Sequence, residues 1–126
     1  MIAAGIIAVA LLLVVTGFQV ALALGAPLGA GAWGGRHRGV LPARLRIASA
    51  ATGLVIYPLV MAIVLDASGL IDVEWLPRGP IVMWALAALF ALGSLANFAS
   101  RSPVERLWGP VALAIAICCT VIAVTS

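Results

Sequence analysis

Four long apolar stretches, each without a charged side chain, divide this chain. They cover residues 1–35, 47–65, 79–100 and 107–126. Each is long enough to cross a hydrocarbon core of about 30 Å, which takes roughly 20 helical residues. The pattern predicts an all-α integral membrane protein, a four-helix bundle with short loops. We expect its helices at about residues 2–24, 45–65, 80–99 and 103–125.

Proline positions give local start and break signals for these helices. Ser102 stands at an N-cap position, Pro103 at the first helical position and Glu105 two residues later, which is the pattern of a capping box. Pro80 opens the third helix in the same way. Pro58 is different, because it lies inside the second span and lacks the N–H that a helix interior uses. We expect it to bend that helix or to free a carbonyl group.

The composition leaves no room for a separate soluble domain. Of 126 residues, 65% are hydrophobic and 9% are charged, so residues 1–126 are expected to form a single transmembrane domain. The first stretch resembles a secretory signal, but no basic residue precedes Arg36, and we expect it to stay as the first helix. The net charge of +3 does not indicate nucleic acid, because the Arg residues lie in short loops beside anionic lipid headgroups.

The Arg residues predict how the chain crosses the membrane. Six of the seven fall in the loop after the first helix or in the turn before the last: Arg36, Arg38, Arg44, Arg46, Arg101 and Arg106. The positive-inside rule makes that side cytoplasmic. The remaining loop carries Asp66, Asp72 and Glu74 against Arg78 alone. We therefore expect a multi-pass protein of a bacterial inner (cytoplasmic) membrane, with both termini outside the cytoplasm (N-out/C-out).

The stretch from Gly25 to Gly35 is rich in glycine and contains the spacing Gly29-x-Gly31-x-x-Gly34. In a soluble protein this spacing is typical of a dinucleotide loop, which requires a preceding strand and a following helix. Here a membrane helix precedes it, so we exclude nucleotide binding. Two interpretations remain: a flexible interfacial connection, or a re-entrant loop that dips into the bundle and uses glycine for close backbone approach.

Gln19 and Asn97 are the two carboxamides inside the predicted spans, and each must find partners in a low-dielectric setting. Both lie one to two turns from the predicted cytoplasmic boundary, so they are at similar depth. One interpretation is an interhelical hydrogen bond worth about 0.6 kcal/mol. The other is a polar pocket that opens to the cytoplasm, with Arg101 or Arg106 above it and Glu105 as a counter-charge.

Catalytic and metal-binding patterns are absent from the sequence. Cys118 and Cys119 are adjacent rather than spaced as a redox pair, and we expect buried structural thiols. His37 lies between Arg36 and Arg38, which repel a cation, so no metal site is expected. We expect no cofactor and no enzymatic activity.

Four segments resemble a group of small four-helix hypothetical membrane proteins of high-GC bacteria. These segments are Gly25-Ala26-Pro27, Ala32-Trp33-Gly34-Gly35, Leu41-Pro42-Ala43-Arg44-Leu45-Arg46 and Asn97-Phe98-Ala99-Ser100-Arg101-Ser102-Pro103-Val104-Glu105-Arg106. The resemblance implies the four-helix topology and marks both predicted cytoplasmic loops as characteristic. It implies no activity, because the group has no established one.

Two functional hypotheses follow from the sequence. The first is a non-enzymatic accessory or interaction component at the cytoplasmic leaflet, with anionic lipid headgroups, further copies of the chain or another membrane protein as partners. Its lipid-phosphate contacts would be Arg36, Arg38, Arg44 and Arg46. The second is an oligomeric channel or carrier for a small neutral or anionic solute, with the pocket residues Gln19, Asn97, Arg101, Glu105 and Arg106 at its site.

Overall fold

The computed structural model describes residues 1–125, and within them every regular element is helical. Four helical spans are long and apolar enough to cross a membrane: Ile2–Ala23, Ala43–Ala67, Pro80–Phe98 and Pro103–Thr125. Their bounds lie within two residues of the predicted ones. The all-α four-helix architecture is therefore confirmed, whereas the N-out/C-out orientation stays a prediction.

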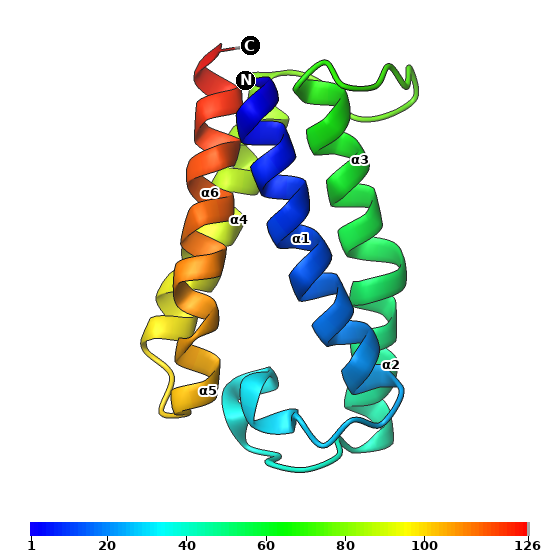
Figure 1. The fold of residues 1–126 in the computed structure, drawn as a ribbon, viewed down its shortest axis with the longest axis vertical. Coiled ribbons are helices and arrows are strands. Elements are labelled where there is room, and N and C mark those ends of the chain that lie inside the picture. Colours follow the sequence, from blue (N-terminus) through cyan, green and yellow to red (C-terminus); the bar gives the residue numbers. More distant parts are fainter. Residues whose placement is uncertain (126) are drawn as a thin grey trace.

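Each span is one helix or a short series of helical segments. Figure 1 labels them α1 (Ile2–Ala23), α2 (Ala43–Ala51), α3 (Tyr57–Ala67), α4 (Pro80–Phe98), α5 (Pro103–Arg106) and α6 (Trp108–Thr125). A π-helical turn, η3 (Thr52–Ile56), joins α2 to α3. Two 3-10 turns, η1 (Gly29–Gly31) and η2 (Trp33–Gly35), lie in the connection between α1 and α2.

The turn η3 lies just before Pro58 and accommodates this proline within the second span. The N–H of Tyr57 bonds to the carbonyl of Thr52, five residues back rather than four. This wider turn takes up the disruption that a proline ring causes inside a helix. Gly53, within η3, lies against α1, where an added Cβ would be 3.1 Å from the Cβ of Gln19. The predicted irregularity at Pro58 is thus a π turn that begins six residues before it.

The bundle consists of two helical hairpins, one formed by α1 with α2 and α3 and the other by α4 with α5 and α6 (Figure 1). Near the chain termini the hairpins pack together around a core that includes Leu12, Val64, Met83, Ile115 and Ile122. Toward the other end they diverge, and residues 25–42 lie between them (Figure 1). The outward faces of the helices are apolar and exposed, as expected for surfaces that contact lipid.

We name residues 25–42 the cap. It has its own small core, in which Ala32 and Leu41 pack against Leu22 of α1. Gly29 is required for this packing, because an added Cβ would overlap the carbonyl oxygen of His37. At Gly31 an added Cβ would lie 2.9 Å from Phe18 and 3.1 Å from Val104. The glycine-rich stretch therefore packs closely between α1 and α5. Close backbone approach of this kind is what the re-entrant interpretation expects.

Candidate functional site

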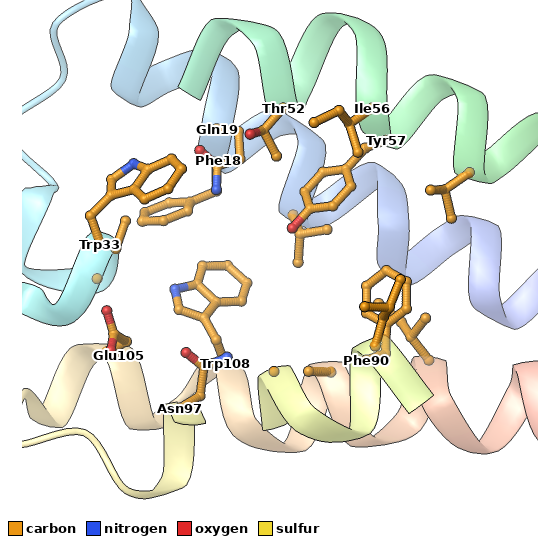
Figure 2. Close-up of a pocket in the computed structure, with 18 of the residues that line it drawn as sticks. Phe18, Gln19, Trp33, Thr52, Ile56, Tyr57, Phe90, Asn97, Glu105 and Trp108 are labelled. Carbon is orange, nitrogen blue, oxygen red and sulfur yellow. The ribbon is translucent and has the colours of Figure 1, made fainter. Parts of the chain in front are cut away.

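A cavity of about 400 Å³ lies between the two hairpins, next to the cap. All four helical spans and the cap contribute to its walls. Five of the lining side chains are aromatic: Phe18, Trp33, Tyr57, Phe90 and Trp108 (Figure 2). Phe18 and Trp108 face each other across the two hairpins with ring centroids 4.8 Å apart.

The rim of the cavity is partly at the side of the bundle. Ile56 of η3 and Leu89 of α4 line it, although these residues are 51% and 64% exposed. Trp33 of the cap is also exposed at the other edge. Exposed apolar residues at a rim face hydrocarbon when the helices stand in a bilayer. The rim of the cavity is therefore exposed laterally at η3 and α4 as well as at the cap, and the opening to the cytoplasm, one of the two interpretations of the sequence, stays a prediction.

The structure brings Gln19 and Asn97 to the same cavity, from opposite hairpins (Figure 2). No hydrogen bond joins them within residues 1–125, so they do not form an interhelical pair here. The Oε1 atom of Gln19 is buried without a hydrogen-bond partner. Thr52 also lines the cavity, but its hydroxyl donates to the Ala48 carbonyl at 2.9 Å. Unpaired buried acceptors are costly, and this oxygen lies among the packed helices rather than on the open surface of the cavity.

Glu105 is the charged residue that lines the cavity, and only 8% of it is exposed. Its Oε2 accepts a hydrogen bond of 2.9 Å from the N–H of Gly34 in the cap. The predicted capping box is half formed: the Glu105 N–H donates to the Ser102 hydroxyl at 3.4 Å, while the Ser102 N–H donates to Ser100 instead. The carboxylate is thereby diverted from its own helix start to the cap.

Arg101 and Arg106 were predicted to lie above the pocket. Both are exposed, and neither lines the cavity in the described part of the chain. The short helix α5 turns Glu105 inward and Arg106 outward. Of the predicted pocket residues, the structure thus brings together Gln19, Asn97 and Glu105 and leaves the two Arg residues outside.

Three hydrogen bonds that involve side chains fasten the cap to both hairpins. Besides the bond from Gly34 to Glu105, the indole N–H of Trp33 donates to the buried hydroxyl of Ser49 at 2.9 Å. The hydroxyl of Ser102 donates to the Ala30 carbonyl. Trp33 has φ 53°, and Gly34 follows in the same left-handed region. A non-glycine residue there costs of order 1 kcal/mol or more, so the indole bond helps to hold a strained turn in place.

The remaining Arg residues of this end belong to the cap or to the start of α2. Arg36, Arg38 and Arg44 are exposed, as contact with lipid phosphates requires. Arg46 is half-buried, and its Nε donates to the Ala23 carbonyl at the end of α1, at 3.1 Å. Arg46 therefore caps a helix terminus, a contact that the sequence did not predict.

The opposite end of the bundle carries an ion-pair network. Arg78 pairs with Asp66 at 2.9 Å and with Asp72. Asp66 also accepts from the N–H of Val73 at 3.0 Å. The side-chain hydrogen bond with Asp66 is the main cause that raises the pKa of Arg78 above its usual value. The loop between α3 and α4 is thus held to the end of α3.

The two cysteines lie in the core of the bundle. Cys118 and Cys119 are buried and carry free thiols. Among residues 1–125 no group of three His, Cys, Asp or Glu side chains is placed to hold a metal ion. The cavity beside the cap is therefore the site with the clearest chemical character.

The aromatic walls of the cavity are what the sequence reasoning missed. Trp33 was noted only as part of the glycine-rich segment, and Phe18, Phe90 and Trp108 were not singled out. One signal was present, because Phe18 is next to Gln19 in sequence and therefore at a similar depth.

Comparisons with protein-family models, curated proteins and solved structures found no match. The bacterial resemblance stays a prediction, and the site is interpreted from its own residues.

Proposed function

We propose that this chain is a non-enzymatic membrane protein that binds a small, mainly apolar ligand in the cavity beside the cap, as a carrier does. The observation that supports this most is the aromatic cavity of about 400 Å³ with the carboxamide residues Gln19 and Asn97 in its walls. Ligand sites in proteins typically have such volumes, with apolar and aromatic walls and a few polar groups that orient the ligand.

The arrangement around the cavity suits a ligand that moves between hydrocarbon and the Arg-rich end. The lateral rim at Ile56 and Leu89 gives access from lipid. On the other side lies the cap, fastened by hydrogen bonds that can break one at a time. Release at that end would require the bonds from Trp33 and Gly34 to open. In this proposal the cap is the gate, and the Arg-rich end faces the cytoplasm of a bacterial cell.

Two glycines allow a sharp test of the cavity. Gly93 lines it, and Gly17 lies on the exposed face of α1; an added Cβ meets nothing within 4 Å at either position. Gly93→Leu therefore fills the cavity, whereas Gly17→Leu adds the same side chain toward lipid. The probe is tert-butylbenzene, added to the protein in phosphatidylcholine nanodiscs. Replacing Trp75 and Trp84 with Phe leaves Trp33 and Trp108 of the cavity as fluorescent reporters.

We expect the probe to change the tryptophan emission with a saturable dependence on concentration. Gly93→Leu should remove that change, and Gly17→Leu should preserve it. A non-saturable response, or equal responses from both variants, would mean that the probe dissolves in the lipid and that the cavity is not a binding site.

An accessory role at the membrane surface is the second candidate, and the exposure of Arg36, Arg38 and Arg44 favours it. Each Arg near an anionic leaflet contributes on the order of 1 kcal/mol. Native mass spectrometry from mixed phosphatidylglycerol and phosphatidylcholine tests this role and reports the oligomeric state as well. Changing the three Arg residues to Gln should reduce the phosphatidylglycerol retained, while Gly17→Leu should not. Equal retention would argue against the accessory role.

A further inference from the structure

We infer that the cavity selects an organic cation with an aromatic or branched apolar body, and that Glu105 supplies its counter-charge. This inference rests on the proposed ligand binding and adds the chemical class of the ligand. It differs from the neutral or anionic solute expected from the sequence. That expectation placed Arg101 and Arg106 at the pocket, whereas the structure places only an acidic charge there.

The first argument for a cationic ligand is that Glu105 is buried without an ion-pair partner among residues 1–125. Buried charged groups in proteins are normally paired or bound to a metal. Glu105 is only 8% exposed, and one backbone N–H, that of Gly34, is its hydrogen-bond partner. Both ion pairs within residues 1–125 involve Arg78, at the opposite end of the bundle. A carboxylate can accept about four hydrogen bonds, so Glu105 retains capacity for a positive group on the cavity side.

The second argument for a cationic ligand is that the cavity walls are aromatic. Figure 2 shows Glu105 at the cap end of the cavity, with Trp33 on the facing side and Trp108 further along. Indole and phenol faces attract cations, Trp most strongly, and the attraction grows when water is excluded. A carboxylate beside several aromatic faces is a combination that suits an organic cation better than a neutral or anionic molecule.

The other polar groups of the cavity carry no charge that opposes a cation. The Tyr57 hydroxyl faces the cavity, and the Gln19 carboxamide lies beside it (Figure 2). The six Arg side chains of this end do not line the cavity in the described residues. Exposed charges are screened within about 8 Å at physiological ionic strength, and access through the lateral rim avoids them. The Arg-rich surface and a cation-selective interior are therefore compatible.

Three probes with one benzene ring and different charge test the inference. They are phenyltrimethylammonium, its neutral isostere tert-butylbenzene, and benzenesulfonate. Binding is measured with the same tryptophan reporters in phosphatidylcholine nanodiscs, after correction for the partition of each probe into protein-free nanodiscs. We expect the cation to bind about tenfold more tightly than its neutral isostere, and benzenesulfonate to bind most weakly.

Glu105→Gln removes the charge and keeps an oxygen that can accept from the Gly34 N–H. Glu74→Gln is the matched control, because it removes one exposed carboxylate at the other end of the bundle. Glu105→Gln should bring the affinities of the cation and the neutral isostere within about twofold of each other, since the Coulomb term is gone. Glu74→Gln should leave the tenfold preference intact.

The outcomes separate this inference from the proposed function. If tert-butylbenzene binds in the cavity and the cation has no advantage in the wild type, ligand binding stands and the cation inference fails. If the cation is preferred equally in both Gln variants, Glu105 is not its counter-charge and the inference also fails. If no probe binds saturably, both proposals fail. The wild-type series decides the charge preference even if Glu105→Gln does not fold.

Discussion

Gly29→Ala should open the cap, because the cap leaves no room for a methyl group at this position. An added Cβ would overlap the backbone carbonyl oxygen of His37 and lie 2.6 Å from that of Gly39. Backbone atoms cannot swing aside, so the chain must separate. That separation strains or breaks the hydrogen bond of 3.0 Å from the Gly29 N–H to the Gly39 carbonyl. Overpacking costs about 1–3 kcal/mol and a lost hydrogen bond about 1 kcal/mol, which together give roughly 2–4 kcal/mol.

Gly39→Ala is the matched control, since it lies in the same cap and an added Cβ there meets nothing within 4 Å. Two measurements apply: the free energy of unfolding in mixed micelles and amide hydrogen exchange of residues 25–42. We expect faster exchange in the cap of Gly29→Ala, lower stability, and near wild-type behaviour of Gly39→Ala. If the two variants exchange alike and differ in stability by less than about 0.5 kcal/mol, the described packing of the cap is wrong.

Three further predictions concern the rest of the bundle. Ser94→Ala removes the buried bond of 2.8 Å from its hydroxyl to the Gly109 carbonyl, and should lower the unfolding free energy by about 0.6–1.5 kcal/mol; unchanged stability would show that this bond does not hold α4 to α6. Arg78→Gln should speed proteolysis of the loop before α4 more than Asp72→Asn does, because Asp72 is 83% exposed and Asp66 is 4% exposed; equal rates would contradict the central role of Asp66. A cysteine in place of Arg38, in a chain without Cys118 and Cys119, should react only with a membrane-impermeant reagent on the cytoplasmic side, and reaction from outside would reverse the predicted orientation.

The four spans could be predicted from sequence because lipid imposes a simple rule. Charged side chains are expelled from hydrocarbon, and every backbone polar group there must bond within its own helix. The charges from Arg36 to Arg46 and from Asp66 to Arg78 therefore bracket the helices closely. Where the charges lie slightly inside a helix, as with Arg44 and Asp66, the predicted ends fall short by about two residues.

Contacts between distant segments could not be predicted in this way. The sequence around Ser102 and Glu105 matches a capping box, yet the carboxylate bonds to Gly34, 71 residues away. Local pattern favours the nearby N–H of Ser102, and the folded cap offers a better-placed one. Pro58 is a similar case. The sequence predicts a disrupted helix there, but not that the disruption takes the form of a π turn whose Gly53 packs against α1.

The cavity depends on which way each helix faces, and a membrane helix conceals this information. In a soluble helix, polar residues mark the outer face and apolar residues the inner one. Here Leu12 is fully buried and Leu13 is 57% exposed, although both are leucine, because lipid and core are equally apolar. Sequence therefore predicts a similar depth for Gln19 and Asn97 without showing which cavity walls they share. The sequence placed Arg101, Glu105 and Arg106 together at the pocket, whereas the turn of α5 sets Glu105 there and Arg106 outward, and this changes the charge that a ligand would meet.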